Sequence, residues 1–114
     1  MNDHAARADA SLRNFDCFGA PCALFISVDS IVDRNGWAHV GMFVQSLLLA
    51  AHARGLATCP QEAWSSWPKL VAEHIGLPDD EVLWCAVAIG YADESDPVNS
   101  LKTERESVEV FARL

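Results

Sequence analysis

The feature that most constrains the fold is residues 37–54, WAHVGMFVQSLLLAAHAR, which the pattern predicts to be one long helix ended by Gly55. At 1.5 Å per residue it would be roughly 27 Å long. Its large apolar side chains are spread around the axis instead of forming one stripe: Val40, Met42, Phe43, Val44, Leu47, Leu48 and Leu49. Such a helix needs cover on several sides. A chain of 114 residues offers little material for that cover, so an oligomer is favoured over a helix wrapped wholly by its own chain.

Two apolar runs on either side of this helix predict buried strands. Residues 22–29, CALFISVD, are short and β-favouring, and residues 82–92, VLWCAVAIGYA, are continuously apolar, as is typical of a central strand. The sequence also predicts a turn at Asn35-Gly36 and a brief extended piece over 56–59. Two further helices are expected over residues 3–15 and 61–74. Together these elements make one small domain spanning residues 1–114.

The charge balance excludes some classes of partner. The chain carries 16 acidic and 8 basic residues, for a formal net charge of −8. Nucleic acids and anionic membrane surfaces both select clustered Lys and Arg, so neither is an expected partner. The longest apolar stretch, residues 40–51, is too short to span a bilayer, and the first 15 residues lack the apolar segment of a secretory signal. We therefore expect a cytoplasmic protein.

The cysteines do not predict a metal site or a disulfide framework. They stand at positions 17, 22, 59 and 85, without paired C-x2-C spacing, and the histidines at 4, 39, 52 and 74 do not complete a zinc set. Free thiols that pack like small apolar groups are the expected outcome. Cys59 leaves a weaker alternative open, because a thiol beside a helix N-terminus can have a lowered pKa and act as a nucleophile.

Two short stretches could bind a ligand. Glu62 opens the helix predicted after Pro60, where unpaired backbone N–H groups gather and could bond to an acceptor atom of a ligand. The alternative is a glutamate that only complements the helix dipole, which is common. Lys102 and Arg105 could donate to a phosphate group. The alternative is a solvated pair that balances the neighbouring Glu104 and Glu106.

The order of these pieces resembles a known family. FGAP, an apolar strand, LLLAAHARGLATCPQEAW, LPDDE, a second apolar strand and GYADESDPVNSLKTERE follow one another over residues 15–111. This order resembles the C-terminal part of the FMN-dependent nitroreductase family. The resemblance implies an α+β fold, with a sheet flanked by helices, and an intertwined homodimer with the long helix at its interface. It also implies FMN at that interface and NAD(P)H as the donor for reducing a small-molecule electron acceptor, a nitro compound or a quinone.

The resemblance also assigns residues to the cofactor. The turn after the long helix would present backbone groups to the N5 edge of the flavin. Ala63 stands where the family often has glycine, which keeps the N–H but narrows the backbone freedom. Arg105 is the best match, and Lys102 the second, to basic residues that hold the FMN phosphate in the family. No side chain is expected to be catalytic, because the flavin carries the hydride chemistry. The cofactor-binding residues implied are Pro60, Gln61, Glu62, Ala63, Lys102 and Arg105.

One departure from the family leaves two functions open. Residues 1–36 contain nothing like the Arg-Ser segment that grips the FMN phosphate and ribityl chain in family members. The first possibility is an FMN-dependent NAD(P)H oxidoreductase of the nitroreductase type. The second is a partial, non-catalytic dimerisation domain that has lost FMN or needs a partner to supply the remaining contacts. Titration with FMN separates the two.

Overall fold

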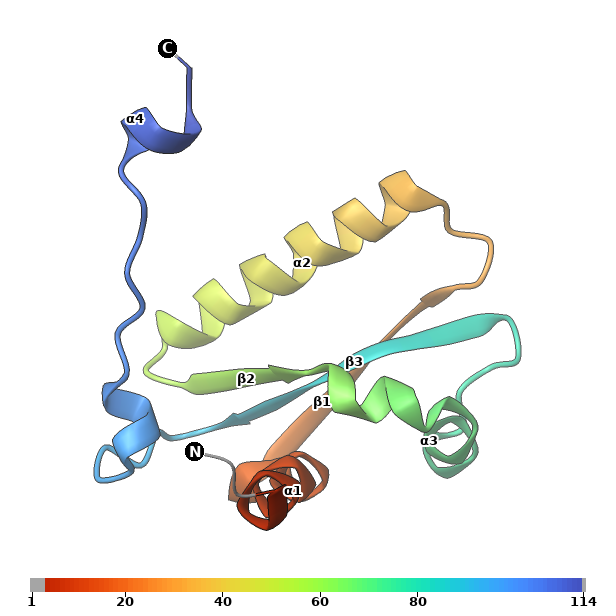
Figure 1. Cartoon of the computed structure of the whole chain (residues 1–114). Helices are drawn as coiled ribbons and strands as arrows, with labels where there is room; N and C mark the ends of the chain where they lie inside the picture. Colours follow the sequence, from red (N-terminus) through yellow and green to blue (C-terminus); the bar gives the residue numbers. More distant parts are fainter. Residues whose placement is uncertain (1–3, 114) are drawn as a thin grey trace.

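The computed structural model describes residues 4–113 as a three-stranded sheet with helices on both faces (Figure 1). Figure 1 shows α2 on one side of the sheet and α1 and α3 on the other, which confirms the α+β class. In chain order the elements are α1 (His4–Leu12), the 3-10 helix η1 (Arg13–Gly19), β1 (Cys22–Asp29), α2 (Arg34–His52), β2 (Ala57–Gln61), the 3-10 helix η2 (Glu62–Ser66), α3 (Pro68–Ile75), β3 (Glu81–Gly90), the 3-10 helix η3 (Pro97–Ser100) and α4 (Val108–Phe111).

The sheet is antiparallel, with strand order β1-β3-β2. The prediction of a central strand near residues 82–92 is therefore confirmed, since β3 has a neighbour on each side. Val87 lies opposite Leu24 of β1 and Pro60 of β2. Pro60 lacks an N–H and is tolerated because β2 is an edge strand.

The buried centre lies between β3 and α2. Val44 of α2 and two residues of β3, Cys85 and Val87, form a buried cluster. Val87 has no exposed surface at all, and burying a valine side chain contributes about 1.5–3 kcal/mol. Partly buried apolar residues pack around this cluster: Ile26, Leu48, Trp84 and Ile89.

Helix α2 begins at Arg34, so the predicted turn at Asn35-Gly36 is wrong. The side chain of Asp33 accepts hydrogen bonds from the backbone N–H groups of Asn35 and Gly36, both at 3.0 Å. These bonds satisfy donors that a helix start otherwise leaves unpaired. Glycine suits position 36 for a steric reason, because a Cβ there would collide with the side chain of Val32. The pair therefore forms the first turn of the helix.

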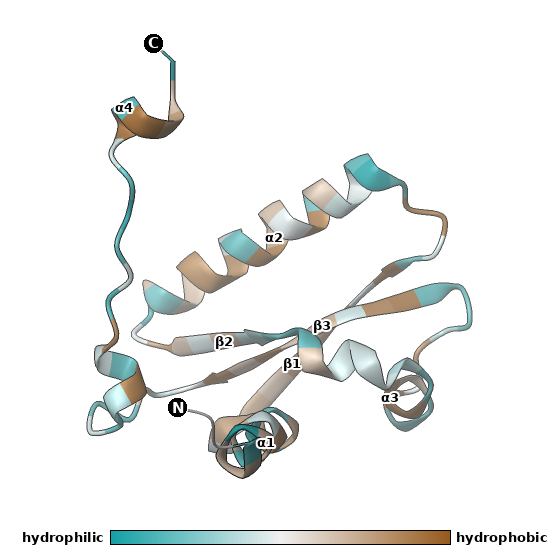
Figure 2. Ribbon diagram, viewed as in Figure 1, coloured by the Kyte–Doolittle hydropathy of each residue, from teal (hydrophilic) through white to brown (hydrophobic). Residues whose placement is uncertain are grey.

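Helix α2 is covered on only one face within a single chain. Of its 19 residues, Val44 and Ala51 are buried. Met42, Phe43 and Leu49 remain 59%, 61% and 60% exposed, and Figure 2 shows apolar colour along the helix. The expected long buried helix is thus buried in part, and the rest of its apolar surface faces away from the chain.

The predicted helix over residues 61–74 is wrong in its first part. Gln61 is the last residue of β2, Glu62–Ser66 form the 3-10 helix η2, and α3 begins only at Pro68. Proline has no N–H and restricts the residue before it, which interrupts a helix. Trp67 has φ −127° and ψ 49°, outside the helical region. The predicted helix over 3–15 ends as α-helix at Leu12 and continues as η1, and its first residue lies outside the described residues.

Residues 101–113 form a C-terminal strap. The chain passes from η3 through residues 101–107 without regular structure and then into α4. Figure 1 shows this strap leading away from the sheet. Its apolar side chains are largely exposed, with Val110 at 69% and Phe111 at 70%.

Candidate functional site

The turn predicted to face a ligand lies where β2 ends and η2 begins. Pro60 and Gln61 are the last residues of the strand, and Glu62 and Ala63 are the first of the 3-10 helix. The side chain of Glu62 is exposed and Ala63 is partly buried. The first N–H groups of such a helix have no partner within it and lie at the positive end of its dipole. The turn can therefore donate backbone hydrogen bonds to an acceptor atom.

Gln61 differs from its neighbours because its side chain points into the protein. It is only 2% exposed. Its Nε2 donates to the carbonyl oxygen of Asn14 at 2.8 Å and lies 3.3 Å from Asn14 Oδ1. Because the whole residue is buried, a ligand at the turn can reach its neighbours but not Gln61. Inside the fold Nε2 of the side chain is bonded to Asn14, while Oε1 is buried without a hydrogen-bond partner.

Trp64 anchors the other end of the turn. Its ring packs edge-on against Phe15, with centroids 5.2 Å apart, and against Phe25, with centroids 5.3 Å apart. Edge-to-face pairs of this kind each contribute about 0.5–1.5 kcal/mol beyond their buried area. The 3-10 helix is thus attached both to η1 and to β1.

Lys102 and Arg105 lie apart from the turn. Both are exposed on the C-terminal strap, and Arg105 Nη1 donates to backbone oxygens of its own segment, including that of Glu104 at 3.0 Å. Gly90 at the end of β3 pairs with Ala57 at the start of β2. The chain therefore leaves the sheet at the opposite end of β2 from the turn, roughly 13 Å along the strand, and reaches the strap after η3.

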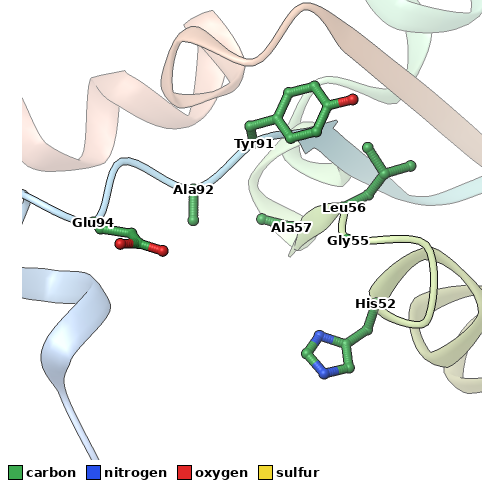
Figure 3. Close-up of a pocket in the computed structure, with 7 residues that line it drawn as sticks. All are labelled: His52, Gly55, Leu56, Ala57, Tyr91, Ala92 and Glu94. Carbon is green, nitrogen blue, oxygen red and sulfur yellow. The ribbon is translucent and has the colours of Figure 1, made fainter.

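A pocket of about 300 Å³ lies near the base of the strap. Figure 3 shows the side chains of His52 and Glu94 on two sides of its open space and Tyr91 above it. It is lined by His52, Gly55, Leu56, Ala57, Tyr91, Ala92 and Glu94. Sequence reasoning missed this pocket because its lining comes from the end of α2, the start of β2 and the loop after β3. Only the strand pairing that sets Ala57 beside Gly90 brings these segments together.

The loop beyond this pocket holds one carboxylate in its charged form. The hydroxyl and the backbone N–H of Ser95 donate to Asp93 Oδ1 at 2.6 and 2.9 Å. These bonds favour the carboxylate and lower the pKa of Asp93 from its ordinary value. The loop is thereby ordered by its own side chains.

The cysteines show no sign of a reactive site. All four thiols are free, and Cys85 is buried in β3. Although Cys59 is exposed overall, burial of its thiol raises the pKa of that group. The expectation of a lowered pKa is therefore wrong, because Cys59 lies within β2 and desolvation outweighs the helix start that follows. A protonated thiol is a poor nucleophile.

Residues 4–113 contain neither a metal-ligating cluster nor a helix suited to crossing a membrane. In this described part of the chain, His, Cys, Asp and Glu side chains do not gather into a group that could hold a metal ion. None of the helices there has the length and apolar character that crossing a membrane requires.

Comparison with known proteins identifies the family. Residues 2–91 match the Nitroreductase family, and the chain belongs to that family. It is 41% identical over 109 residues to a 4-nitrobenzoate reductase of Pseudomonas putida, covering 96% of this chain and 48% of that protein. It is 35% identical over 99 residues to a chloronitrobenzene nitroreductase of Comamonas testosteroni, covering 87% of this chain and 44% of the relative. The chain thus spans about half the length of the curated relatives it matches.

A solved structure extends the match to three dimensions. The FMN and NADPH-dependent nitroreductase NfnB of Sphigopyxis sp. strain HMH superimposes with a TM-score of 0.94 at 37% identity. The superposition covers 100% of this chain and 51% of the NfnB chain. The fold inferred from the order of sequence pieces is confirmed by this likeness.

Proposed function

We propose that the chain acts as an FMN-dependent NAD(P)H oxidoreductase of the nitroreductase type, reducing nitro compounds or quinones. Membership of the family supports this function, as do relatives named for the reduction of nitrobenzoate and chloronitrobenzene. The observation that carries the proposal is the turn at the end of β2. There the N–H groups of Glu62 and Ala63 open a 3-10 helix that is held by a hydrogen bond on one side and a ring contact on the other.

The residues present fit FMN at two separated points. FMN is elongated, with a ring system at one end and a phosphate at the other. The turn of Pro60, Gln61, Glu62 and Ala63 would face the ring, and its backbone donors are the N–H groups of Glu62 and Ala63, since Pro60 has no N–H. The exposed strap supplies cations suited to the phosphate, Arg105 and Lys102. When bound, the flavin would supply the hydride and electron transfer that no side chain of the turn can supply.

We also propose that residues 1–114 form a single, partial nitroreductase-like domain and that two copies pair through the outer face of α2. The support is the apolar surface that the chain leaves bare there, at Met42, Phe43 and Leu49. Contiguous exposed apolar surface marks interaction sites in soluble proteins. A homodimer would cover this surface without requiring a different partner.

An alternative function is a non-catalytic dimerisation domain. One observation favours it: the two cations and the turn lie at opposite ends of β2, and the strap that carries the cations leads away from the sheet (Figure 1). In this alternative the exposed face of α2 is still covered by a second copy, while FMN binds only weakly or needs further contacts from a partner.

Titration of the purified chain with FMN tests the choice, followed by the quenching of flavin fluorescence. Two variants at position 62 separate the contributions of the backbone N–H and of the side chain to FMN binding. Glu62→Ala keeps the N–H and removes the carboxylate, whereas Glu62→Pro removes both. Proline is compatible with this position because Gln61 before it is extended, with φ −132° and ψ 98°. We expect saturable binding, little change in Glu62→Ala, and a dissociation constant raised about tenfold in Glu62→Pro.

The contrary outcomes are distinct. If the unmodified chain shows no saturable binding of FMN, the oxidoreductase proposal fails and the dimerisation domain remains. If Glu62→Ala weakens binding as much as Glu62→Pro, the carboxylate is the group that matters and the assignment to backbone donors is wrong.

A further inference from the structure

Gln61 occupies an unusual position for a polar side chain. Among the described residues, 4–113, it is the one polar or charged residue that is buried. It lies opposite Ala86 in the sheet, a residue with no exposed surface. Placing a primary amide there is costly unless its hydrogen bonds are specific. Its Nε2 makes the hydrogen bonds of the side chain, both to Asn14, while its buried Oε1 has no partner. The position keeps the amide despite an unpaired acceptor, so the bonds of Nε2 are informative about its role.

These bonds join the end of β2 to a distant part of the chain. Gln61 Nε2 donates to the carbonyl oxygen of Asn14, 47 residues earlier, at 2.8 Å. Asn14 belongs to η1, the segment that follows the N-terminal helix. A 2.8 Å bond to a backbone carbonyl fixes both the distance and the direction of the amide. The end of β2 is thus held by η1.

A second contact from the same segment holds the far side of the turn. Phe15, the residue after Asn14, packs against Trp64 with ring centroids 5.2 Å apart. Phe25, which lies opposite Ala86 as Gln61 does, packs on Trp64 as well. Residues 14 and 15 therefore contact the turn both before and after Glu62 and Ala63.

We infer that Gln61 is a positioning residue, whose buried amide, bonded to the carbonyl of Asn14, sets the direction of the Glu62 and Ala63 N–H groups. The inference deepens the proposed function and rests on it, since those N–H groups are the ones assigned to the flavin. It moves the role of Gln61 from direct ligand contact to the orientation of its neighbours. It also makes η1 a support of the site, through Asn14 and Phe15.

The test compares three variants of the full chain. Gln61→Met keeps the length of the side chain and removes the donor. Asn14→Ala removes the weaker 3.3 Å bond to Asn14 Oδ1 but keeps the carbonyl that accepts the 2.8 Å bond. Ser27→Ala removes the hydrogen bond from Ser27 Oγ to Glu81 Oε2 at the other end of the same sheet. It is the control for a general loss of stability.

Two measurements are made on each variant. The first is amide hydrogen exchange at Glu62 and Ala63 by NMR in the flavin-free protein, and the second is FMN titration. In Gln61→Met we expect exchange at both amides to be at least about tenfold faster and the dissociation constant for FMN at least about tenfold higher. Asn14→Ala stays close to the unmodified chain. Ser27→Ala changes the thermal midpoint without a selective effect at the turn.

The inference is overturned if Gln61→Met and Ser27→Ala speed exchange at the turn equally, because the effect is then general. It is also overturned if Asn14→Ala loses as much as Gln61→Met, because the carbonyl bond survives in that variant. Gln61→Asn, an amide too short to reach the carbonyl, serves if Gln61→Met does not fold, and a normal turn in that variant overturns the inference. If the unmodified chain takes up no FMN, the proposed function fails, while hydrogen exchange still decides the role of Gln61.

Discussion

Strand β3 and helix α2 are both strongly apolar in sequence, yet the chain covers them very differently. In β3 the buried residues are Leu83, Cys85, Ala86, Val87 and Ala88, half of a strand of ten. In α2 only Val44 and Ala51 are buried, in a helix of 19 residues. Both segments have the apolar composition of a protein interior, but within a single chain only β3 is largely buried.

The difference follows from how each element finds neighbours. A central strand is paired on both edges, and its two faces are covered here by α2 and by the layer that includes η2 and α3 (Figure 1). A helix packed on one side of a sheet contacts it along a single stripe. An apolar pattern thus predicts that a surface will be buried, but it does not predict whether the same chain or another chain buries it.

The largest effect is expected at the centre of β3. Val87→Asp places a carboxylate at a position with no exposed surface and no cationic side chain in the buried cluster. The loss should be on the order of 4 kcal/mol or more, a large share of the about 5–15 kcal/mol that stabilises a typical domain. We expect the cooperative thermal transition, followed by circular dichroism, to be lost or shifted to much lower temperature.

Val82→Asp is the matched control, because Val82 lies on the same strand and is 41% exposed. It should retain the transition with a much smaller shift. Similar losses in both variants would show that the centre of β3 is not the part on which folding depends.

The next effect concerns assembly and not folding. Phe43→Glu puts a charge on the outer face of α2, where the ring is 61% exposed in the single chain. Burying that charge in a dimer interface should raise the dimer dissociation constant at least about thirtyfold, the factor that corresponds to roughly 2 kcal/mol. Analytical ultracentrifugation over a range of concentrations measures this change, and the helical circular dichroism of the monomer should be preserved.

Gln45→Glu, a charge of the same sign on an already polar and exposed position of α2, is the control and should change the dimer less. An unmodified chain that sediments as a monomer at every concentration would contradict the proposed pairing. The exposed apolar face of α2 would then have to be covered by a partner other than a second copy of the chain.

Much of the fold could be predicted because several signals are local. The predicted bounds 22–29 agree with β1, and Gly55, at φ +74°, ends the turn after α2 as a helix terminator should. Continuous apolar runs bounded by glycine and proline leave few alternatives for a short buried strand. The central place of β3 followed from the same kind of pattern.

The remainder depended on contacts that no local pattern contains. The inward direction of Gln61 is set by Asn14, 47 residues away. The pocket at the base of the strap depends on the pairing of Ala57 with Gly90. The placement of Lys102 and Arg105 away from the turn depends on where β3 ends. The sequence assigned the turn and these two cations to one FMN site. That both bind the same FMN molecule stays a prediction, which FMN titration tests.

The smallest effect tests the start of α2, where local pattern and structure disagreed. A helix with one exposed face gains less stability from packing, so its N-terminal cap should contribute a larger share of that stability. Asp33→Ala removes the acceptor of two 3.0 Å bonds and should cost about 1 kcal/mol, or roughly 3–6 °C in thermal midpoint at low protein concentration. Asp33→Asn retains a capping oxygen and should stay near the unmodified value. If Asp33→Ala is as stable as Asp33→Asn, the first turn of α2 at Asn35-Gly36 forms without the cap, and the exposed face of α2 does not make the cap important.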